Sequence, residues 1–396
     1  MENVRRIYWP AINLIGPGAI GEIGVEIKKL GLKKIFLVTD RVLRAVGVVQ
    51  KVTDVLEAAG LPYVVFDDVK PNPTCKNVHD GLEVFRDSNC DGILSVGGGS
   101  PQDAAKAIGL LHTNGGDIVA YEGIGKSVHK SVPIVAVNTT AGTASEVTIN
   151  YVITDEVRKI KMVMVDPNSL ASVAVNDPEL MVQKPAGLTA ATGMDALTHA
   201  LEAYITKGAF RLSDTLALEA IRLVGESLEA AVADGTDLEA RSGMAWASYI
   251  AGLSFSNCGL GIVHSMAHQL GSEYDLPHGV ANAILLPYVQ EFNAVACPEK
   301  FRNIAKALGK DVAGLPEEEA ATAAIEVLKG LAEKLHIPKL SATTFDPADI
   351  DKLAAQAMAD VCTGGNPRTV TVDDIKAIYR AAYKDVSVFE EMEAVL

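Results

Sequence analysis

Two patterns of apolar residues divide this chain. Short β-rich runs recur at 33–40, 62–68, 91–100, 133–143, 149–156, 159–166 and 171–178, and helical stretches separate the earlier runs. Strands that alternate with helices predict a parallel sheet flanked by helices, which is an α/β fold. The runs at 149–156 and 159–166 meet across Asp155-Glu156 and are more typical of an antiparallel hairpin.

The pattern changes after about residue 184. Segments such as 213–235, 299–309 and 348–362 repeat apolar residues with a period of 3.6 and contain few β-branched runs, which predicts amphipathic helices. We therefore expect two domains, an α/β domain over 1–184 and an all-helical domain over 185–396, with the boundary near Pro178–Pro185.

Composition narrows the class of protein. With 396 residues, 48% hydrophobic and 5% aromatic, the chain is long enough for two well-buried cores. Its formal charge of −15 argues against nucleic acid or an anionic membrane as a partner. The five cysteines form no CxxC pair, and no apolar run reaches about 18 residues. These features indicate a globular protein of the reducing cytoplasm, with neither a disulfide framework nor a membrane span.

Two glycine-rich segments compete as a dinucleotide site. Gly16-x-Gly18-x-x-Gly21 matches G-x-G-x-x-G and has Asp40 about 20 residues further on. Gly97-Gly98-Gly99-Ser100 instead follows the strand ILSV directly and precedes a helix that we expect to begin at Pro101. Glycines there let backbone amides approach a pyrophosphate at a helix N-terminus. We favour the second segment and interpret the first as an ordinary strand-to-helix turn.

Asp40 ends the strand IFLVTD. A carboxylate at this place can accept the adenosine ribose hydroxyls and would repel the 2′-phosphate of NADP, so NAD is the predicted cofactor. The same side chain could instead cap the following helix, and the two roles are compatible. The segment Thr139-Thr140-Ala141-Gly142-Thr143 follows another strand end and offers hydroxyls for the diphosphate or the nicotinamide ribose.

Four histidines and one aspartate gather in the apolar, glycine-rich part of the second half. Asp195 and His199 stand four residues apart on a predicted helix, His264 and His268 repeat that spacing on a later one, and His278 follows in a turn-like segment. Each histidine alone could be a buried, hydrogen-bonded residue. So many imidazoles in apolar surroundings favour a metal site instead, because a bound ion compensates their desolvation. One carboxylate with three imidazoles would also accept Zn²⁺.

With the histidines, the strings GGGSPQD, NTTAGTASEVT and ATGMDALTHALEAY stand in one order, and in this the chain resembles the iron-dependent (group III) alcohol dehydrogenases over nearly its whole length. The resemblance implies the fold shared with dehydroquinate synthase: an α/β nucleotide-binding domain, a helical metal-binding domain, and a cleft between them for NAD and Fe²⁺. It also implies a homodimer.

The resemblance further implies individual site residues. The iron ligands would be Asp195, His199, His264 and His278, and His268 would be a non-ligand histidine near the nicotinamide and a candidate proton relay. Its other interpretation is a packing histidine. The residues that would bind NAD are Asp40, Asn72, Gly98, Gly99, Ser100, Thr139, Thr140, Thr143, Val152 and Lys161.

The substrate is the least defined part of the prediction. The strings EVTINYVITDE, GLGIVHSMAH, PHGVANAILLP and DVCTGGNPR resemble family members that interconvert lactaldehyde and 1,2-propanediol. Gln269 departs from them, because we expect Pro at that position, and it resembles the broader short-chain alcohol and 1,3-propanediol dehydrogenases. Glycerol oxidation remains an alternative.

Two further classes of function compete with these dehydrogenases. One is a lyase resembling dehydroquinate synthase, and the other is a non-catalytic nucleotide-binding protein. No Lys or Arg occurs between Arg241 and Lys300, which favours a small neutral alcohol or aldehyde over the phosphorylated substrate of such a lyase.

Overall fold

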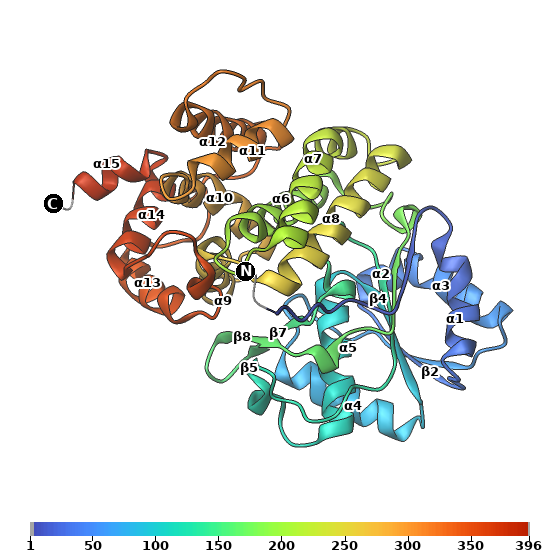
Figure 1. The fold of residues 1–396 in the computed structure, drawn as a ribbon. Helices are drawn as coiled ribbons and strands as arrows, with labels where there is room; N and C mark the ends of the chain where they lie inside the picture. Colours follow the sequence, from blue (N-terminus) through green and yellow to red (C-terminus); the bar gives the residue numbers. More distant parts are fainter. Residues whose placement is uncertain (1–3, 395–396) are drawn as a thin grey trace. The chain divides into compact units, whose positions relative to one another are not determined.

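The computed structural model describes residues 4–394 and divides into two compact units, the first ending at Gln183 and the second beginning at Lys184. The first unit is α/β (Figure 1). Its strands are β1 (Ile12–Ile15), β2 (Ile35–Val38), β3 (Tyr63–Phe66), β4 (Gly92–Gly97), β5 (Gly123–Ile124), β6 (Ile134–Asn138), β7 (Asn150–Asp155), β8 (Ile160–Val165) and β9 (Val173–Asn176). Its helices are α1 (Ile23–Lys29), α2 (Arg41–Ala45), α3 (Val48–Ala58), α4 (Cys75–Asp87) and α5 (Gly99–Asn114).

The main sheet has the strand order β1-β9-β6-β4-β2-β3, and every pairing in it is parallel. Strands β7 and β8 pair antiparallel in a second, three-stranded sheet with β5. The hairpin predicted from the sequence is therefore present, whereas the two-residue β5 was not anticipated.

Helices cover both faces of the main sheet. The side chains of β2 point alternately to one face and to the other, and both sets are buried. Phe36 and Val38 belong to one buried cluster with residues of α4 and α5, while Ile35 and Leu37 belong to a second cluster with residues of α1 and α3. Side chains of a strand point alternately to opposite faces, so a strand buried on both sides is apolar at every position. This explains why β2, β4 and β6 appear in the sequence as continuous apolar runs.

The second unit is helical throughout its described residues (Figure 1). Its helices are α6 (Ala186–Ile205), α7 (Arg211–Ala233), α8 (Leu238–Cys258), α9 (Ile262–Tyr274), α10 (His278–Ala294), α11 (Pro298–Ala307), α12 (Glu317–Lys334), α13 (Ile350–Ala359), α14 (Val372–Lys384) and α15 (Val388–Glu393). Helix α6 is buried on nearly all sides from Thr189 onward. Small residues permit this burial, since a Cβ at Gly193 would lie 2.2 Å from the Leu228 side chain of α7.

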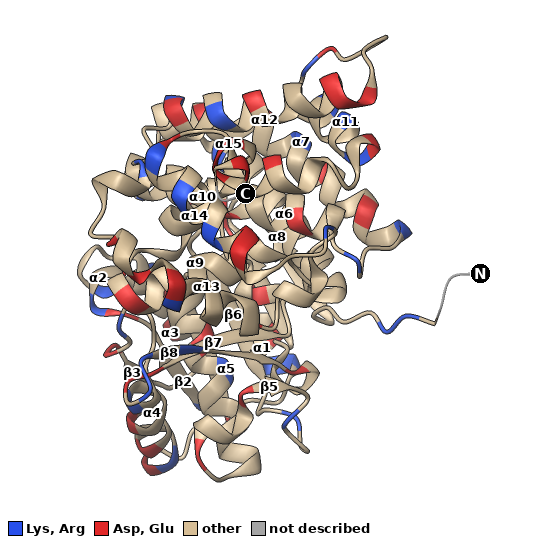
Figure 2. Ribbon diagram, turned by 90° about the vertical axis from the view of Figure 1, so that its left-hand side faces the viewer, with Lys and Arg blue, Asp and Glu red and all other residues tan. Residues whose placement is uncertain are grey.

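Charged residues of both signs are interspersed along the helices in the described part of the chain, as Figure 2 shows for one side of the molecule. No helix among the described residues combines the length and the apolar character needed to cross a bilayer.

Candidate metal centre and dinucleotide site

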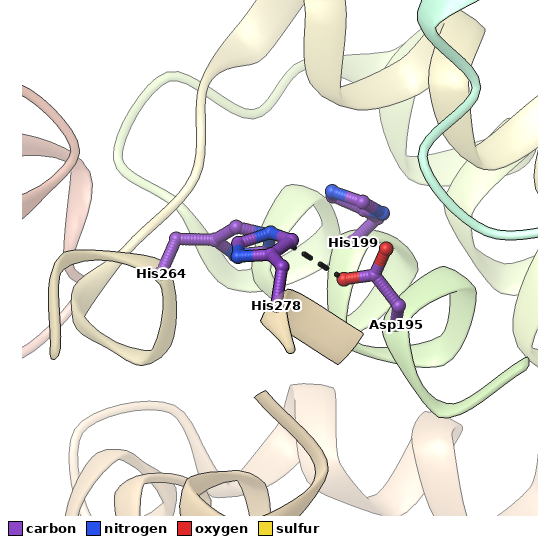
Figure 3. A group of neighbouring side chains, drawn as sticks. All are labelled: Asp195, His199, His264 and His278. Atoms are coloured by element: carbon purple, nitrogen blue, oxygen red, sulfur yellow. Dashed lines mark ion pairs between the residues drawn. The ribbon is translucent and has the colours of Figure 1, made fainter. Parts of the chain in front are cut away.

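Four side chains of the second unit converge on one point. The ligand atoms of Asp195, His199, His264 and His278 all lie within 4.8 Å of one another. Asp195 and His199 are one turn apart on α6, His264 is on α9, and His278 is on α10 (Figure 3). The first three are buried, and His278 is partly exposed, with its Nε2 3.6 Å from Asp195 Oδ1. The four residues that the sequence suggested as ligands are thus together.

The local structure around His278 differs from the sequence expectation. The segment was expected to be turn-like, but His278 is the first residue of α10 and Pro277 is its N-cap. N–H groups in the first turn have no partner within the helix, so a helix can begin directly after proline. A Cβ at Gly279 would lie 2.5 Å from the Ala191 carbonyl oxygen. Glycine therefore lets the start of α10 approach α6 closely enough for His278 to reach Asp195.

Asn282, one turn after His278 on α10, connects the donor group. Its Nδ2 lies 2.7 Å from Asp195 Oδ1, 3.1 Å from His278 Nε2 and 3.3 Å from His264 Nε2. Three candidate ligand atoms from three helices therefore face one point. Sequence reasoning missed Asn282, although its spacing of four residues from His278 was a usable signal.

The electrostatics of the group suit a divalent cation. Burial, together with the imidazoles of His199, His278 and His268, holds the pKa of His264 well below its ordinary value, so this ring is neutral and can offer a lone pair. Burial raises the pKa of Asp195, while His199 and the Asn282 amide act in the opposite direction. Three imidazoles and one carboxylate form a donor set that fits Fe²⁺ or Zn²⁺.

Two buried carboxylates stand behind the histidines of α9. Glu202 Oε2 lies 2.6 Å from His264 Nδ1, and Asp360 Oδ2 lies 2.8 Å from His268 Nδ1. Burial raises the pKa of Glu202 to about 8, against the effect of backbone N–H donors at the start of α9, and a cation held by His264 would lower this pKa and favour the carboxylate. Burial alone would raise the pKa of Asp360, but the His268 imidazole and backbone bonding bring it below its ordinary value. The sequence drew no attention to either carboxylate.

His268 lies beside the donor group without being part of it. Its ring stacks on that of His278, with centroids 5.5 Å apart and an interplanar angle of 15°, and it meets the His264 ring edge-on at 6.1 Å. It is buried. His268 is therefore adjacent to two of the candidate ligands.

The favoured glycine-rich segment of the first unit lies against the threonine-rich loop. A Cβ at Gly98 would lie 2.8 Å from Thr140 Cγ2, and one at Gly99 would lie 3.0 Å from Thr143 Cγ2. Strands β4 and β6 are parallel neighbours, so the loops that leave their carboxyl ends meet at one edge of the sheet. That edge is where open α/β sheets bind ligands.

Helix α5 begins earlier than the sequence suggested. Its first residue is Gly99 and its N-cap is Gly98, so Ser100 lies in the first turn and Pro101 is the third helical residue. Proline fits there because none of the first turn's N–H groups has an intrahelical partner. The amides at the start of this 16-residue helix are thus those of the glycine-rich segment, as an anion site requires.

The other predicted NAD residues lie on neighbouring segments. Asp40 follows β2, the strand beside β4, and caps α2 by accepting the Leu43 N–H at 2.9 Å. Thr139 donates its N–H to the Gly97 carbonyl at 3.1 Å, which ties the two loops together. Capping and ribose binding by Asp40 remain compatible.

Asn72, Val152 and Lys161 lie outside these loops, and the last two belong to the β7–β8 hairpin. Lys161 Nζ lies 2.8 Å from Asn72 Oδ1, and Asn72 has a left-handed backbone with φ of 56°. Val152 donates its N–H to Asp103, an α5 residue, at 2.9 Å. The hairpin is therefore linked to the glycine-rich helix by the partly buried carboxylate of Asp103.

The rival segment at 16–21 has its amides engaged. The N–H groups of Gly18 and Ile20 donate to the two carboxylate oxygens of Asp177 at 3.2 and 3.1 Å. An anionic ligand would have to displace this internal carboxylate. The second half of the segment belongs to a short 3₁₀ turn, Ala19–Glu22, which α1 follows directly. This arrangement is typical of an ordinary strand-to-helix connection.

Two family models match the chain. The one described as iron-containing alcohol dehydrogenase matches residues 10–178, and the one described as Fe-containing alcohol dehydrogenase family, C-terminal, matches residues 189–383. The chain belongs to the iron-containing alcohol dehydrogenase family. The resemblance noted on the sequence motifs is confirmed.

Individual relatives match nearly the whole chain. The NAD-dependent methanol dehydrogenase of Bacillus methanolicus is 47% identical over 380 residues, which cover 96% of this chain and 100% of the relative. The lactaldehyde reductase of Escherichia coli (strain K12) is 48% identical over 371 residues, covering 93% and 97%. A solved structure of 1,3-propanediol oxidoreductase superposes with a TM-score of 0.94 at 48% identity, covering 96% of this chain and 100% of that one.

These matches confirm the predicted fold class and the enzyme class, an oxidoreductase acting on alcohols. The predicted cofactors, iron and NAD, are confirmed at the level of the family, its NAD-dependent relatives and the donor group. The lyase and the non-catalytic alternatives find no support. The relatives act on different alcohols but are almost equally similar to this chain, at 47% and 48% identity. Identity therefore does not favour one substrate over another.

Proposed function

We propose that this alcohol dehydrogenase interconverts lactaldehyde and 1,2-propanediol with NAD as the hydride carrier. The observation that carries the proposal is the convergence of Asp195, His199, His264 and His278 within 4.8 Å. These residues would hold Fe²⁺. The choice of substrate is supported by the strings EVTINYVITDE, GLGIVHSMAH, PHGVANAILLP and DVCTGGNPR, which resemble family members that act on lactaldehyde.

When bound, the metal ion supplies Lewis-acid polarisation of the substrate oxygen, and NAD supplies the hydride acceptor. The chain's own residues would do the rest. Three neutral imidazoles and one carboxylate would leave one positive charge on a divalent ion, which keeps it electrophilic. The buried Asn282 amide would keep Asp195 oriented through its 2.7 Å hydrogen bond.

We assign proton transfer to His268. Its Nδ1 is occupied by Asp360 at 2.8 Å, so its Nε2 is the nitrogen that can exchange a proton with a substrate hydroxyl or with a water. The stacking on His278 holds the ring beside the donor group. A packing role alone would not require a buried carboxylate at Nδ1.

We assign NAD to the carboxyl edge of the main sheet. Gly98, Gly99 and Ser100 would present backbone amides to the diphosphate, with Thr139, Thr140 and Thr143 on the adjoining loop, as their positions around β4, β6 and α5 suggest. Asp40 would accept the adenosine ribose hydroxyls. The remaining proposed contacts are Asn72, Val152 and Lys161.

A second candidate function is the oxidation of 1,3-propanediol or another short primary alcohol. Gln269 favours it, since this residue lies in the interior of α9 next to His268, where we expect Pro in lactaldehyde reductases. The similarity to a 1,3-propanediol oxidoreductase structure favours it as well. Both candidates need a small neutral substrate, in keeping with the lack of Lys and Arg from 242 to 299.

The test is an anaerobic assay of protein that has been stripped of metal and reloaded with Fe²⁺ or Zn²⁺. NADH oxidation is followed with lactaldehyde, propanal and 3-hydroxypropanal, and glycerol oxidation is followed with NAD. We expect Fe²⁺ to restore turnover and lactaldehyde to have the highest kcat/KM. A clear lead for 3-hydroxypropanal would transfer the assignment to the second candidate. Equal turnover in stripped and reloaded protein would refute the metal's role.

We also propose that the protein is a homodimer, which light scattering on the purified protein tests. We propose further that the enzyme is cytoplasmic, which fractionation of the source cells tests.

A further inference from the structure

Helix α9 has two histidine–carboxylate pairs one turn apart. His264 Nδ1 lies 2.6 Å from Glu202 of α6, and His268 Nδ1 lies 2.8 Å from Asp360, the residue directly after α13. All four side chains are at least nine-tenths buried, with 1% to 7% of each exposed. The same ring nitrogen is engaged in both pairs, but the two carboxylates come from different elements.

We propose that these pairs have separate roles: Glu202 positions His264 as a metal ligand, and Asp360 positions His268 for the reacting substrate without contributing to metal binding. This inference rests on the proposed function, because it assumes that an ion binds to the donor group. It assigns two positioning residues that lie outside the predicted site.

The geometry at His264 supports the first role. An imidazole that donates its Nδ1–H to a carboxylate keeps the lone pair on Nε2, and Nε2 is the atom near Asn282 Nδ2 at 3.3 Å, on the side of the donor group. Without Glu202 the ring could take the other tautomer, with the proton on Nε2. That tautomer cannot bind a cation through Nε2.

Glu202 is itself held tightly. Its Oε1 accepts the Val263 N–H at 2.7 Å, so the carboxylate sits at the N-terminus of α9 as well as on the His264 ring. A Cβ at Gly261 would lie 2.9 Å from the same Oε1, so glycine is what permits this approach. Negative charge is favourable at a helix N-terminus. One side chain thereby fixes both the start of α9 and the orientation of its first histidine.

Helix α6 supplies this support together with two of the ligands. Glu202 follows Asp195 by seven residues and His199 by three, a spacing that puts all three on one face of a helix. The apolar run ALTHALEAY thus contains a buried glutamate for a physical reason. A carboxylate this deep is costly unless several donors meet it, and here a ring N–H and a backbone N–H do so.

Asp360 is fixed independently of α6. Its Oδ1 accepts the Cys362 N–H at 2.9 Å, and the same segment is bonded to α9 through Thr363 Oγ1 and Ser265 Oγ at 2.7 Å. The string DVCTGGNPR therefore has a structural task, which is to present Asp360 to α9. Because His268 is not one of the four converging ligands, losing Asp360 should leave the ion in place.

The test measures metal binding apart from turnover. Metal-free wild type, Glu202→Gln and Asp360→Asn are titrated with Co²⁺ against a competing chelator, with the visible absorption of the bound ion as the signal. Asp117→Asn is the matched control, because Asp117 pairs with His79 at 3.5 Å on the surface of the first unit. We expect Glu202→Gln to bind Co²⁺ about 10–100-fold more weakly. Asp360→Asn and the control should stay within about threefold.

Kinetics of the metal-saturated protein give the second measurement. Asp360→Asn should lower kcat at least about tenfold with KM for the aldehyde nearly unchanged, since an amide favours the wrong tautomer of its histidine. The division of roles would be overturned if both variants lost Co²⁺ affinity to the same extent. It would also be overturned if neither variant lost any. An unchanged kcat in Asp360→Asn would overturn its half of the inference. A wild type that binds no Co²⁺ would instead refute the proposed function.

A variant that fails to fold would leave the first half open, so a second substitution is needed. Glu202→Asp keeps the charge but shortens the side chain by one methylene, which withdraws the carboxylate from His264 Nδ1. It should also weaken Co²⁺ binding at least about tenfold, and an affinity equal to that of the wild type would contradict the role of Glu202. Circular dichroism of each variant establishes that it is folded.

Discussion

The two units present ligand-binding groups in different ways. In the first, the candidate NAD site consists mostly of backbone and small side chains at strand ends, where Gly98 and Gly99 lie against Thr140 and Thr143. In the second, the candidate metal site consists of long side chains from three helices. A backbone site depends on the path of the chain, whereas a side-chain site depends on tautomers and rotamers that other residues must hold. The second kind therefore needs supporting residues.

Removing a ligand should have the largest effect. We expect His264→Ala to lose the bound metal and at least about a thousandfold in kcat/KM, because the donor group falls to three and Glu202 is left buried without its ring partner. Metal analysis and anaerobic NADH oxidation check this. The exposed His129 serves as the control, and His129→Ala should match the wild type. Full metal content in His264→Ala would contradict the proposal that the metal site depends on individual side chains.

A methyl group in the backbone site should have the next largest effect. The Cβ of Gly98→Ala would lie 2.8 Å from Thr140 Cγ2, so one loop must move. We expect NADH affinity to fall at least about tenfold, or about 1.4 kcal/mol, while Co²⁺ affinity stays unchanged. Fluorescence titration with NADH measures the first quantity. A parallel loss of both affinities would mean that the two sites are not built separately.

Buried charge in the first unit should show itself in the pH dependence of stability. Burial raises the pKa of Glu146 from 4.5 to about 7. The folded protein therefore binds more protons than the unfolded chain between these values, so Glu146 makes stability fall as pH rises from 4.5 through 7. Glu146→Gln removes this dependence and keeps an acceptor for Asn176, whose amide bonds Glu146 Oε1 at 2.9 Å.

We expect the Glu146→Gln variant to gain about 1–3 kcal/mol over the wild type at about pH 8 and little at about pH 4.5. Urea unfolding at both pH values, followed by circular dichroism, gives the difference. An equal gain at both pH values would mean that the effect does not come from ionisation.

The smallest effect should come from the glycine motif that resembles a dinucleotide fingerprint. A Cβ at Gly21 would meet no atom within 4 Å, the backbone there has no positive φ, and the neighbouring amides are bonded to Asp177. We expect Gly21→Ala to change NADH affinity less than about twofold, well under about 1 kcal/mol. A tenfold loss of NADH affinity in the same titration would instead indicate that residues 16–21 bind the dinucleotide.

Much of this architecture could be predicted from the sequence because it depends on neighbours along the chain. The apolar runs of β2, β4 and β6, the capping by Asp40, and the pairs Asp195/His199 and His264/His268 are all local patterns. A turn was expected at His278 because Pro and Gly stand on either side of it, and this prediction was wrong. Here they mark the start of α10 and its close approach to α6.

The supporting residues could not be predicted in the same way. Glu202 and His264 are 62 residues apart, and His268 and Asp360 are 92 apart. The residues around Asp360 do not predict that it binds a histidine, because Asp360 and His268 meet only when α13 packs on α9. Glu202 does share a helix face with Asp195 and His199, but a shared face alone does not identify its partner 62 residues away. Long-range pairs of this kind become visible only in the folded chain.

The spacing of Asp195, His199 and Glu202 on α6 also constrains the chain's length. Each residue turns an α-helix by about 100°, so one residue inserted between Asp195 and Glu202 would swing the later side chains off the face that the ligands share. An insertion at Asp311–Leu315, between α11 and α12, would disturb no such register. We expect deletions and insertions to be confined to connections of that kind, while substrate preference changes through substitutions around a helix whose length is fixed.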